Sequence, residues 1–340
     1  MIELSVITPT FQRRESVLRL LDALDRQTVG PCAFEVIVAD DGSSDGTVNA
    51  VSRRSSSFAL EVLVLAHGGA AAARNAAIAR ARGRVLVFFD DDVVPDPDAL
   101  AVHAALHREP GLVVVGPMLP AVGARRSAWV RWEEEKLERQ YDALRRGLYP
   151  CTPRQFYTGN ASVERERVLR VGGFDERLRR GEDVELAYRL QATDVRFVFA
   201  PGARVRHDPT RTYASWRHAR YEYGRIDVIM ERDKGHQMLS EHFAEYHARH
   251  VLSRALARLT VGRRRVRALA LAALDAFVTM SHGSRAARLA APALSAVSNV
   301  LYWQGVSDEL GGANVLWRAI EVARAGGSGR PGIPRRDVAE

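Results

Sequence analysis

The stretch VLVFFDDDVVPDPDAL, residues 85–100, decides how the first third of this chain is expected to fold. Its apolar run is short and rich in valine and phenylalanine, which is typical of a buried β-strand. Three consecutive acids, Asp90, Asp91 and Asp92, end the run, and the proline and aspartate residues after them favour the start of a helix. Because three neighbouring carboxylates repel one another, either water solvates them or a cation binds there.

The same strand-then-helix pattern recurs throughout residues 1–118. Four other runs have strand character: LSVITPT (4–10), FEVIVAD (34–40), LEVLVLA (60–66) and LVVVGPM (112–118). The segments between them have the apolar spacing or the alanine content of helices. This alternation predicts an α/β fold, with a Rossmann-like, mostly parallel sheet and helices on both faces. In such sheets, ligands bind beyond the carboxyl ends of the strands.

The composition bounds the partners of the chain, which has 340 residues and a formal net charge of +8. The basic residues are nearly all arginine, since Lys136 and Lys234 are the only lysines. A GC-rich coding sequence can produce this bias, so we expect no nucleic-acid partner. A basic surface would still attract anionic ligands or lipid headgroups. Cys32 and Cys151 form no CxxC pattern, which argues against a disulfide framework or a zinc site.

The amino-terminal and apolar segments indicate a cytoplasmic protein. The first residues, MIELSVITPT, lack the basic start and apolar core of a signal peptide. The longest apolar window, residues 268–280, is interrupted by Asp275. It falls short of the about 20 residues that span a bilayer. Peripheral contact with the inner face of the cell membrane stays open.

Two acid clusters follow strands of the predicted sheet. Asp40 and Asp41 end the run at 34–40 and could accept hydrogen bonds from a base or a ribose. Alternatively, they cap the helix that starts near Ser44. The acids at 90–92 suit Mg²⁺ or Mn²⁺, which prefer oxygen ligands and bind through one or two carboxylates plus phosphate oxygens. The alternative there is a solvated turn.

Three further polar positions are candidates for the same site. Arg74 lies on the helix between the acid clusters and could reach a base or a diphosphate, or it could be an ordinary surface arginine. Glu182 and Asp183 open a helix, where the dipole favours acids, and a carboxylate there can also serve as a general base. His207 follows a short strand and is either structural or, near metal-binding acids, a ligand.

Five segments together resemble the family 2 glycosyltransferases with a GT-A fold. They occur in the order and spacing of that family and cover residues 3–208. The segments are VITPTFQRRESVLRLLDAL, VIVADDGSSDGT, AAARNAAIARARGRVLVFFDDD, TGNASVERERVLRVGGFDE and RGEDVELAYRL.

The resemblance implies a nucleotide-sugar donor, with UDP as the first expectation, a divalent metal and inversion at the anomeric carbon. Asp90 and Asp92 match the two acids of the family's Asp-x-Asp motif, and His207 matches a histidine that completes the metal site in some members. Asp183, next to Glu182, matches the catalytic base. The positions that match the donor nucleotide site are Thr8, Pro9, Asp40, Asp41, Arg74, Asp90 and Asp91, and those near the donor-sugar and acceptor pocket are Gly159 and Asn160.

Two features missing from the sequence and three rival functions bound this expectation. The QxxRW motif and the transmembrane helices of processive synthases are missing from the sequence, which favours transfer of a single sugar. One rival is a sugar-phosphate nucleotidyltransferase, but PTFQRRE after the first strand lacks the glycine-rich loop of those enzymes. The second is a noncatalytic nucleotide-sugar-binding protein. A dinucleotide-binding oxidoreductase is disfavoured because no G-x-G-x-x-G follows a strand.

The resemblance and the change in composition divide the chain. We expect a catalytic domain at 1–208, with a nucleotide-sugar-binding part (1–118) and an acceptor and catalytic part (119–208). Residues 209–323 are expected to form a helical region, and 324–340 a disordered tail. Arginines at 263–267 precede an apolar helix, so this region could lie on a membrane, pack on the catalytic domain or form a homo-oligomer. The acceptor could be a carbohydrate, a lipid-linked sugar or a small molecule.

Overall fold

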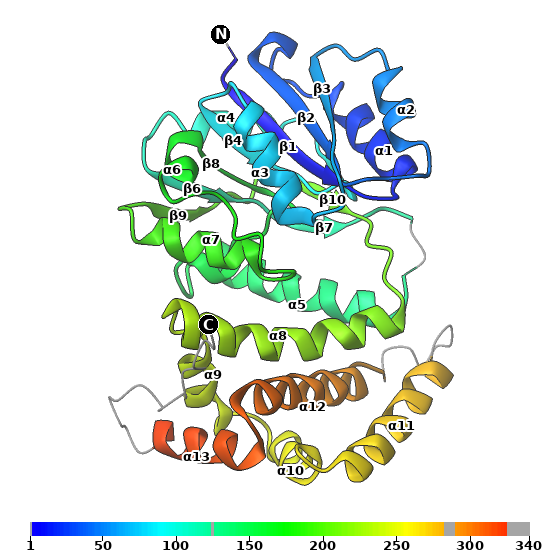
Figure 1. Cartoon of the computed structure of the whole chain (residues 1–340), viewed down its shortest axis with the longest axis vertical. Coiled ribbons are helices and arrows are strands. Elements are labelled where there is room, and N and C mark those ends of the chain that lie inside the picture. Colours follow the sequence, from blue (N-terminus) through cyan, green and yellow to red (C-terminus); the bar gives the residue numbers. More distant parts are fainter. Residues whose placement is uncertain (1, 124–125, 282–289, 325–340) are drawn as a thin grey trace. The chain divides into compact units, whose positions relative to one another are not determined.

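The computed structural model describes residues 2–123, 126–281 and 290–324, and the chain forms two compact units (Figure 1). Unit 1 comprises Met1–Ala124 and Glu134–Pro209, and unit 2 comprises Arg125–Glu133 and Thr210–Glu340. The whole of 119–208 was expected in the catalytic domain, but Arg125–Glu133 groups with unit 2. In that unit, Trp132 packs in the same apolar cluster as Trp216.

Unit 1 is built on a seven-stranded sheet with the order β3-β2-β1-β4-β8-β6-β9. Only β8 runs antiparallel to its neighbours β4 and β6, which confirms the predicted mostly parallel α/β sheet. A smaller sheet has the order β5-β10-β7. The strands are β1 (Leu4–Thr10), β2 (Phe34–Asp40), β3 (Ala59–Val64), β4 (Val85–Phe88), β5 (Val93–Pro95), β6 (Leu112–Val115), β7 (Met118–Pro120), β8 (Ala161–Glu164), β9 (Arg196–Phe199) and β10 (Val205–His207).

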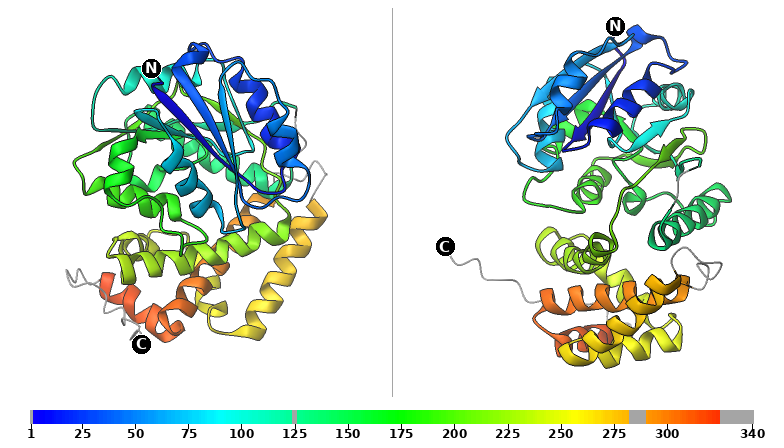
Figure 2. Two further views of the ribbon diagram at one scale, coloured as in Figure 1. Left: turned by 45° about the horizontal axis from the view of Figure 1, so that its top comes forward. Right: turned by 90° about the vertical axis from the view of Figure 1, so that its right-hand side faces the viewer.

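Helices cover both faces of the large sheet (Figure 2). The helices of this unit are α1 (Arg14–Leu24), α2 (Thr47–Ser52), α3 (Ala70–Arg80), α4 (Ala99–Leu106), α6 (Arg165–Arg170) and α7 (Glu182–Gln191), with 3-10 turns at Pro31–Ala33 and Pro153–Gln155. The long helix α5 (Ala128–Arg145) begins in the segment that belongs to unit 2 and ends in unit 1.

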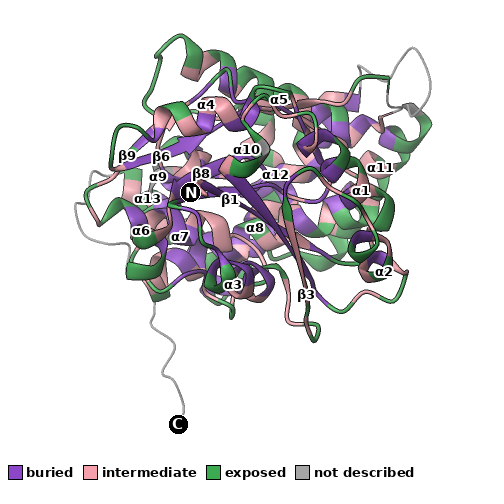
Figure 3. Cartoon of the chain, turned by 90° about the horizontal axis from the view of Figure 1, so that it is seen from above, coloured by how far each residue is buried: buried purple, intermediate pink, exposed green. Residues whose placement is uncertain are grey.

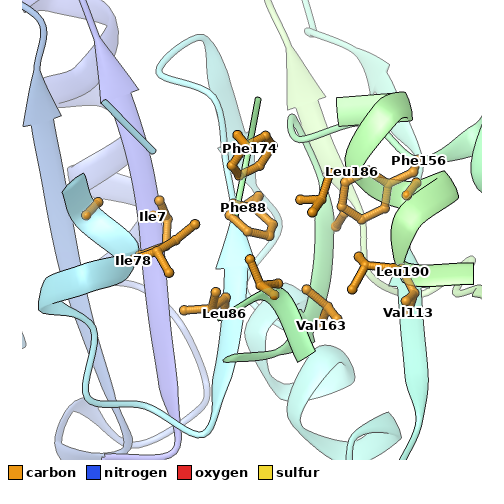
Figure 4. Close-up of a cluster of buried hydrophobic side chains, with 14 of the residues drawn as sticks. Ile7, Ile78, Leu86, Phe88, Val113, Phe156, Val163, Phe174, Leu186 and Leu190 are labelled. Atoms are coloured by element: carbon orange, nitrogen blue, oxygen red, sulfur yellow. The ribbon is translucent and has the colours of Figure 1, made fainter. Parts of the chain in front are cut away.

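The two faces hold separate apolar cores because side chains of a strand alternate between them. Ile7 and Phe88 belong to the core under α3, α6 and α7 (Figure 4). Their neighbours Val6 and Val87 belong to the core under α1, α2 and α4. Figure 3 accordingly shows the central strand β1 in the colour of buried residues, whereas the edge strand β3 and the outer sides of the helices are more exposed. This double burial explains why the strand runs in the sequence are almost continuously apolar.

The strand register brings the polar strand ends to one rim of the sheet. Thr10 of β1 pairs with Asp40 of β2, and Ile7 of β1 pairs with Phe88 of β4. Because these three strands are parallel, the residues that follow them emerge at the same edge. In the smaller sheet, His207 of β10 pairs with Val93 of β5, so the histidine lies beside the end of the acidic run.

Unit 2 is helical, as predicted for the carboxy-terminal region. Its helices are α8 (Tyr213–Lys234), α9 (Met238–Tyr246), α10 (Val251–Thr260), α11 (Arg264–Ser281), α12 (Ala290–Leu310) and α13 (Ala313–Arg324). Helices α8 and α12 approach closely at two glycines: a Cβ on Gly224 would lie 2.0 Å from the Tyr302 carbonyl oxygen, and one on Gly305 would lie 2.0 Å from that of Tyr221.

The carboxy-terminal region was also considered for membrane-spanning helices and for a disordered tail. No helix in the described ranges is long and apolar enough to cross a membrane. Of the tail expected at 324–340, Arg324 is the last residue of α13, and the remaining positions lie outside the described residues.

Candidate active site

The three acids after β4 point to three different partners. Asp91 is buried and accepts hydrogen bonds from Thr10 Oγ1 at 2.7 Å and from Arg13 Nη1 at 3.2 Å. The same Arg13 nitrogen donates to Asp92 Oδ2 at 2.7 Å, and His207 Nε2 lies 3.5 Å from Asp92 Oδ1. Asp90 is the most exposed of the three and accepts from Arg74 Nη2 at 2.8 Å. Each carboxylate therefore has a cationic or imidazole neighbour, which offsets the repulsion in the run.

The surroundings separate the pKa values of two of these acids. Burial raises the pKa of Asp91 to about 7, against the opposing effect of Arg13. Burial would also raise the pKa of Asp92, but His207 and Arg13 outweigh it and hold that pKa well below its usual range. Asp92 is therefore the acid that stays ionised, as a metal-binding carboxylate must.

Arg74 connects the acids after β4 to the start of α7. Its guanidinium is almost fully buried and donates from Nη1 to Glu182 Oε1 at 2.9 Å, in addition to its bond with Asp90. It also lies over the ring of Phe174, 5.5 Å from the centroid. Although burial opposes it, the two carboxylates raise the pKa of Arg74. The arginine that the resemblance placed with the nucleotide thus joins two acidic segments that are far apart in the sequence.

Asp183 lies in the first turn of α7, which follows Gly181 in the left-handed conformation. Its Oδ1 accepts the backbone N–H of Val184 at 2.8 Å. Burial and then the adjacent charge of Glu182 raise the pKa of Asp183 to about 7. A carboxylate with a pKa near the working pH is well suited to accept a proton in a reaction.

The acids after β2 have different environments. Asp41 accepts the backbone N–H groups of Gly68 at 2.7 Å and Gly69 at 2.9 Å, and His67 Nδ1 lies 2.9 Å away. Asp40 is fully buried and uses Oδ2 to accept the Ser43 N–H at 2.8 Å.

Two polar side-chain atoms of β1 and β2 lack hydrogen bonds within the described chain. They are Oδ1 of Asp40 and the hydroxyl of Thr8, and both are buried. Buried polar atoms without partners are rare in native proteins and call for a ligand or a water molecule. Pro9, between Thr8 and Thr10, is partly buried.

Gly159 and Asn160 lie together before β8 but have different surroundings. A Cβ on Gly159 would lie 2.5 Å from Met118 Sδ, so a larger residue would displace the Met118 side chain, and it would also touch Asp90 Oδ2 at 3.4 Å. Asn160 is fully buried, and its amide nitrogen donates to the carbonyl oxygens of Pro117 and Ala203. These bonds hold the loops around the site.

Several site residues were missed in the sequence. Arg13 bridges Asp91 and Asp92, and Thr10 binds Asp91. Phe11 is 42% exposed, and its ring centroid lies 4.5 Å from that of His67. The signal was the segment TFQRRE directly after the first strand, where an exposed aromatic and two arginines follow a strand end.

The side chains that could hold a divalent cation are few. In the described ranges, no three His, Cys, Asp or Glu side chains gather into a ready-made metal site. Asp92 and His207 nevertheless offer an ionised oxygen and an imidazole nitrogen that face each other, and Asp90 is nearby in the same turn. This donor set fits a cation that takes its remaining ligands from water and phosphate oxygens.

Comparisons with known proteins bear on the family and the fold of this chain. The model of the family described as "Glycosyl transferase family 2" matches residues 5–171. A curated relative, validoxylamine A glucosyltransferase of Streptomyces hygroscopicus subsp. limoneus, is 33% identical over an alignment of 220 residues, and the match covers 56% of this chain and 48% of that protein. The chain thus spans about half the length of this relative.

Solved structures with similar folds include two glycosyltransferases. The mannosyltransferase PcManGT of Pyrobaculum calidifontis, in complex with GDP-Man and Mn²⁺, has a TM-score of 0.57 at 21% identity, with 89% of this chain and 86% of that chain covered. S. aureus TarS 1–349, in complex with UDP-GlcNAc, has a TM-score of 0.54 at 19% identity, with 97% and 93% covered. The chain has the GT-A fold of these proteins.

Proposed function

Because residues 5–171 belong to glycosyl transferase family 2, we propose that this chain transfers a single sugar from a nucleotide-sugar to an acceptor hydroxyl. One observation carries the proposal. Arg74 binds both Asp90 and Glu182, so the acids expected at the donor and the aspartate expected to act as a base share one site.

Two features after β1 and β2 support a nucleotide at this rim. The unpartnered Oδ1 of Asp40 can accept an N–H of a base, and the hydroxyl of Thr8 can donate or accept. The exposed ring of Phe11 offers an apolar face on which a base could stack. We propose uridine as the base because TarS is described with UDP-GlcNAc. Guanosine is the alternative, since PcManGT is described with GDP-Man.

The acids after β4 would hold the diphosphate through a divalent cation. Asp92 and His207 would bind the cation, with Asp90 beside it. Such a cation supplies charge neutralisation for the departing diphosphate. Arg13 lies against both Asp91 and Asp92, so its guanidinium is also within reach of an anion that approaches these carboxylates. Asp91, which is buried and accepts the Thr10 hydroxyl, ties the acidic turn to the end of β1.

Asp183 is proposed as the general base of an inverting transfer. The acceptor oxygen attacks the anomeric carbon from the face opposite the diphosphate, and the bond from that carbon to the diphosphate oxygen breaks. The proton of the acceptor hydroxyl passes to an Asp183 carboxylate oxygen. Because a carboxylate is a weak base for a hydroxyl, the proton moves late, when the oxygen already carries positive charge. Arg74 orients this region by holding Glu182, the neighbour of the base.

A binding and turnover panel tests the function. UDP-sugars and GDP-sugars would be titrated by calorimetry with Mn²⁺, and again with a chelator. We expect one donor class to bind. Without an acceptor, slow hydrolysis of that donor should release its nucleoside diphosphate. Binding without any turnover, with a range of acceptors supplied, would favour the noncatalytic alternative. Release of pyrophosphate from a nucleoside triphosphate and a sugar phosphate would indicate a nucleotidyltransferase.

A further inference from the structure

Helix α11 in unit 2 exposes an apolar face. Leu269 is 74% exposed and Met280 is 81% exposed. The side chains on this face are Val266, Leu269, Ala273, Ala276, Phe277 and Met280. Their spacing follows one side of an α-helix, and the stretch is about 21 Å long at 1.5 Å per residue. The opposite side of α11, which includes Leu271 and Val278, packs in the core of the unit.

The preceding helix, α10, has the same character. Val251, Leu252 and Leu259 are 59%, 70% and 55% exposed, whereas Ala257 on the other side is fully buried. A soluble helix normally carries polar residues on its outer face. Two consecutive helices thus both present apolar side chains to solvent, and exposed apolar side chains in such number call for a partner.

Arginines lie between these two apolar faces. Arg263, Arg264 and Arg265 occupy the turn from α10 to α11 and the first residues of α11, and all three are exposed. No salt bridge within the described ranges engages these three side chains. The only acid in α10 or α11 is Asp275, and it is bound by Arg217 at 2.7 Å.

A cavity of about 670 Å³ opens beside the same arginines. Its lining includes Arg263, Arg264 and Arg267 together with Ala313 and Asn314, at the start of α13. Guanidinium groups and the backbone N–H groups at a helix start both attract phosphate.

A buried hydroxyl gives independent support for a ligand in this cavity. Ser307 is 1% exposed and lines the cavity, and its Oγ has no hydrogen-bond partner in the described chain. An unsatisfied hydroxyl of this kind suits a phosphate oxygen. Asp308 also lines the cavity, but its two carboxylate oxygens are occupied by Tyr221 and Gln304.

The apolar side chains and the arginines together indicate which partner covers α10 and α11. A second copy that covered α10 and α11 by a twofold contact would bring the same surface against itself. The arginines would then face arginines, with no free carboxylate on either helix. An anionic lipid bilayer offers phosphates to the arginines and hydrocarbon to the apolar side chains, in the way that interfacial helices bind membranes.

We propose that the exposed faces of α10 and α11, with Arg263, Arg264 and Arg265 between them, dock on an anionic phospholipid membrane. A lipid phosphate binds in the cavity next to Ser307. The surface lies on the membrane and does not span it, which agrees with the absence of a membrane-crossing helix in the described residues. This docking does not depend on the proposed transfer reaction.

Vesicle co-sedimentation of the full chain tests the proposal. The wild type is expected to bind vesicles that contain phosphatidylglycerol and to stay in solution with phosphatidylcholine alone. Changing Arg263, Arg264 and Arg265 together to Gln should weaken binding about 100-fold, since each basic residue contributes about 1 kcal/mol at an anionic surface. The apolar pair Leu269→Gln and Met280→Gln should weaken it at least about tenfold, and should do so at high salt as well.

Matched controls lie in unit 1. The control for charge is the exposed set Arg26, Arg53 and Arg108, each changed to Gln, and the control for apolar exposure is Leu148→Gln. Both controls should bind like the wild type. All the substituted side chains, in the test variants and in the controls, are exposed. The melting temperature of each variant should therefore stay close to that of the wild type.

Three results would overturn the proposal. One is equal or absent binding to both kinds of vesicle, and another is equal loss of binding in the control variants. The third is a stable dimer that the Leu269→Gln and Met280→Gln changes dissociate, because a second copy would then cover the face. Inorganic phosphate that raises the melting temperature without vesicle binding would assign the cavity to a soluble phosphate and also contradict membrane docking.

Discussion

The ends of β2 and β4 carry the same pattern, a buried strand followed by consecutive aspartates, but they use these acids differently. After β2, both oxygens of Asp41 accept backbone N–H groups of the loop before α3, His67 Nδ1 lies 2.9 Å from one of them, and Asp40 keeps one buried oxygen unpartnered. After β4, the acids face an arginine or a histidine. The partners of a carboxylate, more than the number of acids, indicate its role. Bonds to the backbone fix a loop, whereas contacts to side chains can rearrange around a ligand.

The largest expected effect is on kcat, at Asp183 in the first turn of α7, which Arg74 connects to the acids after β4. Asp183→Asn should lower kcat by about 1000-fold, within the range of a lost general base, while the affinity for the donor changes little. Single-turnover kinetics and donor titration would measure the two quantities. Burial raises the pKa of Asp183 above its value in the unfolded chain. At a pH above the unfolded pKa, the ionised carboxyl therefore destabilises the folded state. The variant should therefore melt at a higher temperature than the wild type at pH 8. Normal transfer by this variant would remove Asp183 from the reaction.

The next effect compares the two strand ends directly. Asp92→Asn should lower kcat/KM by about 100-fold, which corresponds to the loss of about 3 kcal/mol in the transition state. Mn²⁺ affinity, measured by calorimetry without a donor, should fall as well. The matched substitution on the other strand, Asp41→Asn, should leave Mn²⁺ affinity unchanged. An equal loss of Mn²⁺ binding in both variants would break the distinction between the two ends.

The pH dependence follows from the raised pKa of Asp183, about 7. A base must be deprotonated to act, so kcat/KM should rise as pH increases toward 7 and level off above it. Between pH 5.5 and pH 8 the expected rise is about 30-fold. The residual activity of Asp183→Asn should lack this rise. An ascending limb centred near pH 4 would contradict the assignment.

A smaller effect is expected at the unpartnered oxygen of Asp40. In Asp40→Asn, an amide N–H can replace the free Oδ1, so a base N–H would lose its acceptor. The affinity for the nucleotide should fall about tenfold, equivalent to one hydrogen bond to a charged group. Titration with the free nucleoside diphosphate would measure it. Unchanged affinity would place the base elsewhere on the rim.

The smallest effect on chemistry is expected at Asp41. Asp41→Asn removes an acceptor from the Gly68 and Gly69 N–H groups, and should lower the free energy of unfolding by about 1–3 kcal/mol. Turnover by the folded fraction should change little. Thermal unfolding with a parallel activity assay below the transition would separate the two. A large loss of kcat at unchanged stability would show that Asp41 contacts the substrate after all.

Much of this site follows from local chemistry in the sequence. The apolar runs predict the strands because buried β-structure needs continuous apolar side chains. The acids at their ends follow from the rule that ligands bind beyond the carboxyl ends of parallel strands. The family resemblance assigned roles to Asp183 and His207. The role of Arg13 was missed, because its contact with Asp91 and Asp92 joins positions nearly 80 residues apart.

The sequence alone determined the fold class, the strands β1, β2, β3, β4 and β6, and the set of polar residues available for chemistry, because propensity and apolar periodicity act over short stretches of chain. Only the tertiary structure decided which carboxylate faces which partner. Strand register placed His207 beside Asp92, and helix packing brought Arg74 between Asp90 and Glu182. Register and packing are long-range properties, so the burial and charge that set each pKa are defined only once the chain has folded.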